Sequence, residues 1–291
     1  MATQHGEGTT RWDGLSGEPL ADALAIAHHL PVTGRLGVAY SGGVDSAVLL
    51  AIAVRALGAG RALGLLAVSD SLARDELRLA HETAAEMGAT VVEFETREGD
   101  NPAYRANDVD RCFHCKDEMF TVIDTRLVAE LGLAAVAYGE NADDAARIDR
   151  PGARAATNHD VLRPLAAAGL TKRRVRELAR ALGLSVADKP AAPCLASRIP
   201  HGQEVTPAKL KQVEAGEEAL RAAGFSDARV RHHGDIARIE VPVAELALFA
   251  EEGRRAAVLA ALRAAGFPHV TVDLAGLQSG AFTLQVLSRR G

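Results

Sequence analysis

The residues with the clearest chemical pattern form a loop, Ser41-Gly42-Gly43-Val44-Asp45-Ser46, between two apolar runs. The run before the loop has the length of a buried strand, and the run after it has the length of a helix. A glycine turn that leads from a strand into a helix directs several backbone N–H groups at one point, which suits an anion. We expect Gly42 and Gly43 to adopt positive φ, and Ser41 and Ser46 to add hydroxyl donors. The loop therefore predicts a phosphate-binding site.

This loop resembles the SGGxDS signature of the PP-loop ATP pyrophosphatases, which cleave ATP between the α- and β-phosphates and adenylate a substrate. It lacks the Gly-Lys-Ser/Thr ending of a Walker A loop. The resemblance implies an ATP site with Mg²⁺. Asp45 is predicted either to bind Mg²⁺ or to stabilise the loop by accepting backbone N–H bonds. Asp144 is a second candidate for Mg²⁺, the alternative being a solvated surface acid.

Three cysteines, Cys112, Cys115 and Cys194, form the second chemical pattern. In a reducing compartment a C-x-x-C pair such as Cys112 and Cys115 is more often a metal, cluster or redox pair than a disulfide. Three thiolates fall one short of an all-cysteine zinc site, a gap that His114 or water would fill. Three thiolates can also hold a [4Fe–4S] cluster with one iron left open. The alternative is that all three are small buried residues without chemical function.

The surrounding chain predicts an α/β fold, because strand-length and helix-length runs alternate between residues 34 and 190. Such alternation is typical of a parallel sheet covered by helices on both faces, with ligands at the C-terminal ends of the strands. The expected strands cover 36–40, 62–69, 90–95 and 134–138, and the expected helices cover 46–57, 74–87, 115–131 and 171–182.

After the proline-rich segment 188–194 the order changes to α-β-β-α-β-β, which predicts a smaller α+β domain. Its expected helices cover 206–223 and most of 244–265, and its expected strands cover 228–232, 236–243, 269–274 and 281–287. We predict three regions: a disordered tail (1–16), a PP-loop ATP pyrophosphatase domain (17–199) and an α+β domain for substrate binding and oligomerisation (200–291).

Composition limits the classes of partner. No signal peptide or membrane-length apolar run is apparent, so we expect a cytoplasmic protein without a membrane partner. The net charge is −5, and the region from Pro200 onward carries 11 basic and 11 acidic residues by our count of the sequence. A neutral region favours a small-molecule substrate over a nucleic acid, since RNA-binding proteins usually present a basic face.

Further strings resemble one family, LarE, of ATP-dependent sulfurtransferases that act on pyridinium-3,5-biscarboxylic acid mononucleotide. The specific strings are residues 193–202, around Cys194, and residues 229–240; the resemblance spans about residues 20–287. It implies that the enzyme adenylates a substrate carboxylate and that a protein-held sulfur displaces AMP. The product is a precursor of the nickel-pincer nucleotide cofactor of lactate racemase.

The resemblance also implies roles for particular residues. Some members carry only the cysteine that matches Cys194 and lose its sulfur in a single turnover, whereas others match all three cysteines and resemble enzymes with a [4Fe–4S] cluster. This chain is of the three-cysteine type. Gly139 and Asn141 are implied in the nucleotide site. Glu140 departs from the smaller or neutral residue usual there, and a carboxylate beside the nucleotide needs a metal or a basic neighbour.

Three arginines are candidates for substrate binding. Arg229 and Arg231 alternate along a predicted strand and therefore share a face, which suits a substrate phosphate. Arg198 follows Cys194 on one loop and is predicted to steer a substrate carboxylate. For each of them the alternative is an ordinary ion pair. Arg238 and Glu240 also share a strand face and are expected to pair with each other.

Several alternatives stay open from the sequence. The sulfur donor is unspecified, and Cys194 is either a cluster ligand or the sacrificed sulfur source. The resemblance implies a homo-oligomer. A PP-loop enzyme of tRNA thiolation or amidation is the second reading, and a non-catalytic nucleotide-binding module or sulfur carrier is the third.

Overall fold

The computed structural model describes residues 10–147 and 151–278. Their tertiary contacts divide the chain into two compact units. The first unit takes in the described residues up to Ser69, together with Arg74–Glu98 and Cys112–Ala192; the second takes in Asp70–Ala73, Gly99–Arg111 and the described residues from Pro193 onward. The long segment of the second unit begins at Pro193, earlier than the predicted boundary at 199/200. The second unit also includes two short segments from earlier in the chain, Asp70–Ala73 and Gly99–Arg111.

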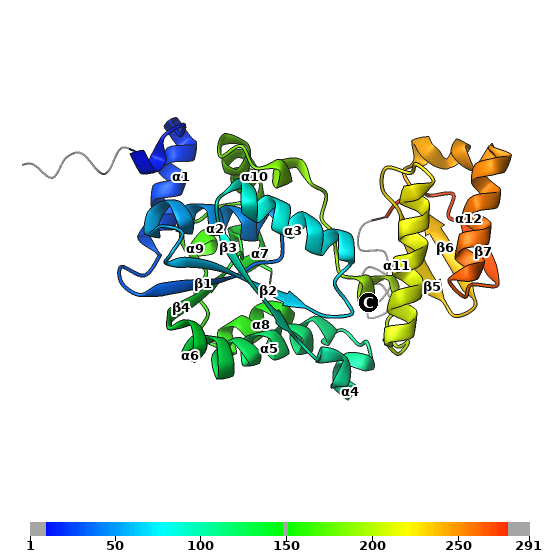
Figure 1. The fold of residues 1–291 in the computed structure, drawn as a ribbon, viewed down its shortest axis with the longest axis horizontal. Coiled ribbons are helices and arrows are strands. Elements are labelled where there is room, and N and C mark those ends of the chain that lie inside the picture. Colours follow the sequence, from blue (N-terminus) through cyan, green and yellow to red (C-terminus); the bar gives the residue numbers. More distant parts are fainter. Residues whose placement is uncertain (1–9, 148–150, 279–291) are drawn as a thin grey trace, which may run out of the picture. The chain divides into compact units, whose positions relative to one another are not determined.

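The first unit is built on a four-stranded parallel sheet in the order β3-β2-β1-β4, which confirms the predicted fold class (Figure 1). The strand order reverses between β1 and β4, and ligands of open α/β sheets bind at such a switch point, beyond the carboxyl ends of the strands. The elements are η1 (Thr10–Trp12), α1 (Gly17–His28), β1 (Arg35–Ala39), α2 (Val44–Leu57), β2 (Ala62–Val68), α3 (Arg74–Glu86), β3 (Thr90–Glu95), η2 (Glu98–Asp100), α5 (Arg111–Val122), η3 (Ile123–Leu127), α6 (Val128–Leu131), β4 (Leu133–Tyr138), α7 (Ala142–Ala145), α8 (Pro151–Asn158), α9 (Pro164–Ala167), α10 (Lys172–Ala181) and η4 (Ser185–Asp188).

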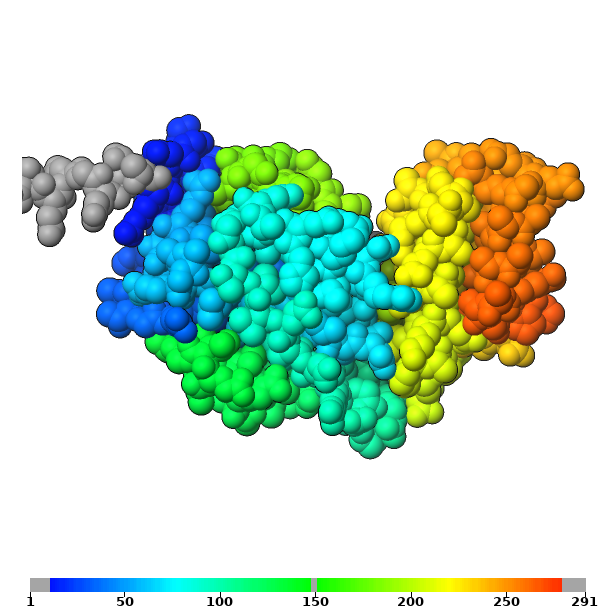
Figure 2. All heavy atoms as spheres, in the orientation of Figure 1, coloured from blue at the N-terminus to red at the C-terminus, as the bar shows by residue number. Residues whose placement is uncertain are grey.

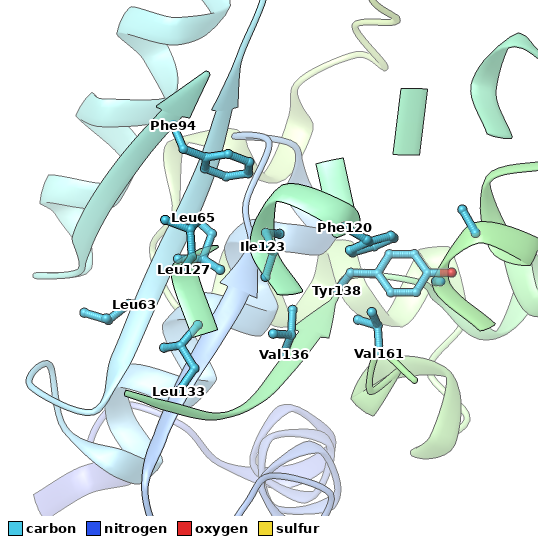
Figure 3. Close-up of a cluster of buried hydrophobic side chains, with 12 residues drawn as sticks. Leu63, Leu65, Phe94, Phe120, Ile123, Leu127, Leu133, Val136, Tyr138 and Val161 are labelled. Atoms are coloured by element: carbon cyan, nitrogen blue, oxygen red, sulfur yellow. The ribbon is translucent and has the colours of Figure 1, made fainter. Parts of the chain in front are cut away.

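Helices cover the sheet because each strand presents apolar side chains to them. On one face Phe120 and Ile123, from α5 and η3, join Leu65 and Leu133 of the strands in a buried cluster (Figure 3). Helix α2 contacts β1 and β2 as well as α1 and α10, and nine of its 14 residues are buried. Burial on most sides explains why the sequence of α2 is almost uniformly apolar.

The helix predicted over 115–131 differs from the observed one in two respects. Helix α5 begins at Arg111, so Cys112 and Cys115 both lie on it, one turn apart. A π-helical segment, η3, interrupts the helix before α6. Residues three apart on a helix share a face, so the C-x-x-C pair is presented on one side of α5.

Part of the predicted tail is folded. Residues 10–12 form η1, and Leu15 is buried. Arg11 Nη1 donates a hydrogen bond to the carbonyl oxygen of Ala56 at the end of α2, at 3.0 Å. Residues 1–9 lie outside the described part of the chain.

The second unit contains a three-stranded sheet in the order β5-β6-β7. Strands β5 and β6 are antiparallel, and β7 is parallel to β6. Val230, Ile239 and Leu262 are fully buried in its core, and α11 and α12 lie at the surface of this unit (yellow and orange in Figure 2). The elements are α4 (Pro102–Arg105), η5 (Leu195–Arg198), α11 (Pro207–Ala222), β5 (Arg229–His233), β6 (Ile236–Glu240), η6 (Val243–Ala250), α12 (Glu252–Ala264) and β7 (His269–Val272).

The predicted α-β-β-α-β order is confirmed as far as residue 278. The helix expected over 244–265 is divided, with η6 followed by α12. The strand expected at 281–287 lies outside the described residues. No helix within residues 10–147 and 151–278 is long and apolar enough to cross a membrane.

One partly buried histidine, His159, predicts a pH dependence of stability. His159 Nδ1 lies 2.6 Å from Asp124 Oδ2, and its Nε2 lies 3.2 Å from Asp117 Oδ1. Burial lowers the pKa of His159, but the two carboxylates outweigh it and raise the pKa above the usual 6.5. The folded state therefore binds the proton more tightly, so its contribution is complete below about pH 6.5 and is lost as pH rises through the raised pKa.

In the wild type the free energy of unfolding should therefore fall as the pH rises through the pKa of His159. We expect this fall to be absent in His159→Gln, as measured by urea denaturation from about pH 5.5 to 8.5. The exposed His28 provides the matched control. A His28→Gln variant should retain the wild-type pH profile. An unchanged profile in His159→Gln would show that the two carboxylates do not hold the proton.

Candidate functional site

The loop after β1 has the geometry of an anion site. Gly42 has φ +69°, and a Cβ there would lie 2.7 Å from Ala80 Cβ of α3, so no larger residue fits. The Ser46 hydroxyl accepts a hydrogen bond from the Ser41 N–H at 3.2 Å and donates one to the Gly43 oxygen at 3.0 Å. The positive φ predicted for Gly43 is wrong, because this residue has φ −80° and serves as the N-cap of α2.

Gly139, directly after β4, packs against the start of α2. A Cβ on Gly139 would lie 2.7 Å from the backbone nitrogen of Ser46 and 2.8 Å from the carbonyl carbon of Asp45. Backbone atoms cannot move aside as a side chain can. The glycine is therefore needed for the close approach of β4 to the phosphate loop.

The side-chain amide of Asn141 donates hydrogen bonds to both Asp45 and Asp144 and so holds the two carboxylates close together. Asn141 Nδ2 donates to Asp45 Oδ1 at 3.2 Å and to Asp144 Oδ2 at 3.0 Å. Asn141 is 1% exposed, and its Oδ1 accepts the Asp144 N–H as the N-cap of α7. Two carboxylates held this way beside a phosphate loop are suitable oxygen ligands for Mg²⁺.

Lys172, the first residue of α10, was not predicted from the sequence to be part of the site. Its Nζ lies 2.5 Å from Asp45 Oδ2. Thr171 before it is the N-cap, with its hydroxyl accepting the Arg174 N–H at 3.4 Å. Thr171 could be recognised as an N-cap from the sequence. The residues around Lys172, however, do not indicate that its side chain reaches Asp45, which lies 127 positions earlier.

Glu140 has the basic neighbour that its position requires. The side chain is 1% exposed, and its Oε2 lies 3.4 Å from Arg163 Nε. Arg163 follows Leu162, whose backbone pairs with β4 through the Tyr138 N–H and the Val136 carbonyl. This pairing places the arginine beside the end of β4.

All three cysteines lie within the described residues, and none of them forms a disulfide there. Cys112 and Cys194 are exposed, and Cys115 is partly exposed, so the alternative of three buried cysteines is excluded. Cys112 and Cys115 belong to the first unit and Cys194 to the second. Within residues 10–147 and 151–278 no three His, Cys, Asp or Glu side chains form a group that could hold a metal.

Arg198 is held inside the second unit. Its Nε and Nη2 donate to the two carboxylate oxygens of Glu217 at 2.8 and 3.0 Å, and its Nη1 donates to the Cys194 carbonyl at 3.1 Å. Both side chains are about 5% exposed or less. Glu217 also accepts the Val230 N–H at 3.0 Å. These contacts describe a residue that positions the Cys194 loop, and they do not support direct contact with a substrate carboxylate.

Asn107 and Arg111, which were not predicted from the sequence, also hold the Cys194 loop in place through hydrogen bonds. Asn107 is fully buried with φ 55°, and its Nδ2 donates to three carbonyl oxygens, those of Ile199, Pro200 and Gln203. Arg111 Nη1 donates to Asn107 Oδ1 and to the Ala196 carbonyl, at 2.6 and 2.8 Å. The only signal in the sequence was the position of Arg111, immediately before Cys112.

The arginines of β5 are also engaged within their own unit. Arg231 Nη2 donates to Glu240 Oε2 at 2.8 Å and to the Gln278 carbonyl at 2.9 Å. Arg229 Nη1 donates to the Ala228 carbonyl at 2.8 Å and to the Asp227 carboxylate.

The predicted pair between Arg238 and Glu240, two positions apart on β6, is confirmed. Arg238 Nη1 lies 3.2 Å from Glu240 Oε1. Glu240 is fully buried and binds two arginines, Arg231 and Arg238, one at each oxygen.

The parallel sheet, the glycine loop at its switch point and the carboxylates beside it define a PP-loop ATP-using domain. The family described as asparagine synthase matches residues 20–239. The chain belongs to this PP-loop family and, within it, to the LarE family, and it is an ATP-dependent sulfurtransferase enzyme.

Three relatives show how far the similarity extends. The chain is 40% identical to an uncharacterized protein, slr1717, of Synechocystis sp. over 243 residues, which are 84% of this chain and 90% of that protein. It is 35% identical to the pyridinium-3,5-bisthiocarboxylic acid mononucleotide synthase of Lactiplantibacillus plantarum over 84% of this chain and 88% of that one. A tRNA(Ile)-lysidine synthase of Burkholderia mallei is 34% identical over 128 residues, 43% of this chain and 25% of that protein.

Proposed function

We propose that this enzyme transfers sulfur to an adenylated carboxylate of pyridinium-3,5-biscarboxylic acid mononucleotide, in the biosynthesis of the nickel-pincer nucleotide cofactor. The observation that carries the proposal is the combination of a complete phosphate loop with three cysteines outside disulfides in a chain 35% identical to a synthase of the corresponding thiocarboxylate. A nucleotide-binding module without catalysis would need neither the cysteines nor the carboxylates beside the loop.

The phosphate loop supplies the first half of this reaction. Backbone N–H groups at the start of α2 and the Ser41 and Ser46 hydroxyls bind the pyrophosphate portion of ATP. Asp45 and Asp144 would hold Mg²⁺, and its charge would stabilise the departing pyrophosphate. The substrate carboxylate attacks the α-phosphate and forms an acyl adenylate.

The cysteines supply the second half. In this proposal the thiolates of Cys112 and Cys115, one turn apart on α5, and that of Cys194 would together hold a [4Fe–4S] cluster. When bound, such a cluster offers an open iron position for an additional sulfide. Cys194 as a sacrificed sulfur source is the competing role, and its exposure suits both.

Substrate binding is assigned to the second unit. We propose Arg229, which is partly exposed, as the contact for the substrate phosphate. Arg198 and the buried Arg231 then act by positioning the Cys194 loop and β5. Residues 200–291 also provide the surface for a homo-oligomer in this proposal.

Iron and sulfide content, measured on protein reconstituted without oxygen, tests the sulfur chemistry. About four irons per chain, lost in Cys194→Ser and in Cys112→Ser/Cys115→Ser, support the cluster. If the protein is colourless and its mass falls by about 34 Da after turnover, the mass of one H₂S, Cys194 is the sulfur donor that is consumed. ATP–pyrophosphate exchange that does not depend on the pyridinium substrate would contradict the proposed substrate.

Thiolation or amidation of tRNA is the second candidate, favoured by the similarity to tRNA(Ile)-lysidine synthase. That similarity covers less than half of this chain. Specific tRNA binding at physiological salt, together with tRNA-dependent ATP cleavage, would replace the first proposal.

A further inference from the structure

Arg163 lies beside the end of β4, the strand that approaches the phosphate loop. Leu162 forms a parallel bridge with Ala137 of β4, and its carbonyl accepts the Tyr138 N–H at 3.0 Å. Paired strands lie about 5 Å apart, so the backbone of Arg163 runs next to the end of β4. Gly139 at that end packs against the start of α2. The arginine is therefore placed at the edge of the proposed ATP site, within the first unit.

The guanidinium of Arg163 is engaged through two of its three nitrogens. Its Nε lies 3.4 Å from Glu140 Oε2, and its Nη2 donates to the Ala153 carbonyl at 3.2 Å and to the Thr157 hydroxyl. Nη1 makes no hydrogen bond to any residue within 10–147 and 151–278. Because 31% of the side chain is exposed, this nitrogen is a donor that a ligand can reach.

An ion pair that only stabilises the fold is the competing explanation. The Glu140 side chain is 1% exposed, and its Oε2 has no hydrogen-bond partner among the described residues. A buried ion pair stabilises a fold only when the pairing is close and the oxygens are hydrogen-bonded. A separation of 3.4 Å at an oxygen without a hydrogen bond meets neither condition. The pair is better explained as a means of orienting the guanidinium.

The surroundings of Arg163 also include the helix that carries two cysteines. The guanidinium carbon of Arg163 lies 6.0 Å from the centre of the Tyr138 ring, and Lys116 Nζ lies 4.7 Å from the same centre. Lys116 directly follows Cys115 on α5. A substrate that is first adenylated and then receives sulfur has to be held where it can reach both ATP and a cysteine. The position of Arg163 meets this requirement.

We propose that Arg163 binds a carboxylate of the substrate, the one that is not being adenylated, and that Glu140 is the positioning residue that orients the guanidinium. Hydrogen bonds from a guanidinium to a carboxylate are charge-assisted and specific in geometry. The proposed substrate carries two carboxylates on its pyridinium ring, so one reacts with ATP while the other is available to Arg163. The proposal rests on the proposed function and adds to it a substrate contact in the first unit.

Substrates with one and with two carboxylates test this assignment. ATP–pyrophosphate exchange is measured with pyridinium-3,5-biscarboxylic acid mononucleotide and with pyridinium-3-carboxylic acid mononucleotide, which lacks the second carboxylate. We expect the wild-type kcat/KM to be about 10- to 100-fold higher for the biscarboxylate, the range expected for a hydrogen bond between charged groups. Arg163→Met should lower kcat/KM for the biscarboxylate by about the same factor and leave that for the monocarboxylate within about twofold.

Two further variants separate recognition from folding. Arg163→Met alone leaves Glu140 as a buried charge, so Arg163→Met/Glu140→Gln removes both charges and should show the same loss of selectivity. Arg61→Met is the matched control. Arg61 is also partly exposed and donates to two carbonyls, those of Gly34 and Val32, at 2.9 Å each, but it precedes β2 at the opposite end of the sheet. This variant should keep the wild-type kcat/KM for both substrates.

The outcomes separate this inference from the proposed function. Equal wild-type kcat/KM for the two substrates overturns the inference alone. An equal loss for both substrates in Arg163→Met and in the double variant also overturns it, by showing that the ion pair only supports the fold. Exchange that depends on neither pyridinium substrate overturns the proposed function, and the inference falls with it.

Discussion

Gly139→Ala is expected to reduce ATP–pyrophosphate exchange by about 100-fold, the typical result of displacing a reacting group by about 1 Å. The added Cβ would meet the Ser46 nitrogen at 2.7 Å and the Asp45 carbonyl carbon at 2.8 Å. Contacts this short force β4 and the start of α2 apart. The phosphate loop would then lose the alignment of its N–H groups with the pyrophosphate.

Gly60→Ala is the matched control for this substitution. A Cβ at Gly60 would have no neighbour within 4 Å, and the residue has no positive φ. We expect its exchange rate and unfolding free energy to equal those of the wild type within experimental error. A wild-type exchange rate in Gly139→Ala would show that the loop tolerates displacement and that activity does not need the close approach of Gly139 to α2.

Arg198→Met is expected to lower the free energy of unfolding by about 3–5 kcal/mol, the usual cost of breaking a buried ion pair on one side. The substitution leaves the Glu217 carboxylate, which is 4% exposed, without its two guanidinium donors. It also frees the Cys194 carbonyl. We therefore expect faster alkylation of Cys194, measured by mass spectrometry, together with a lower urea midpoint.

The double variant Arg198→Met/Glu217→Leu distinguishes positioning from substrate binding. Removing both charges avoids an uncompensated buried carboxylate, so the double variant should be more stable than Arg198→Met. A direct substrate role makes a different prediction. In that case Arg198→Met would raise KM for the pyridinium substrate and leave stability and Cys194 alkylation unchanged.

The predictions from sequence were most accurate where the information is local. Alternating strand and helix lengths gave the four parallel strands, because each element is specified by its own apolar period. The loop at 41–46 was located from its glycines and hydroxyls alone. The helix expected to begin at Cys115 begins at Arg111 instead, since helix ends depend on the contacts of their first residues.

The sequence could not distinguish arginines that bind a ligand from arginines that are held internally. Arg198 and Arg231 were predicted to bind substrate, yet each reaches a buried carboxylate, Glu217 or Glu240. An arginine has the same local pattern in both situations. Its role depends on which carboxylate comes within about 3 Å after folding.

The sequence by itself therefore determined the class of fold, the phosphate loop and the three thiols, because their chemistry resides in residue type and short spacing. The tertiary structure alone decided the contacts that complete them. Lys172 reaches Asp45 across 127 positions, and Gly139 meets the backbone of α2. The physical reason is that charge pairing and steric exclusion act over a few ångströms in space. The number of residues between two positions in the sequence does not tell how close they lie after folding.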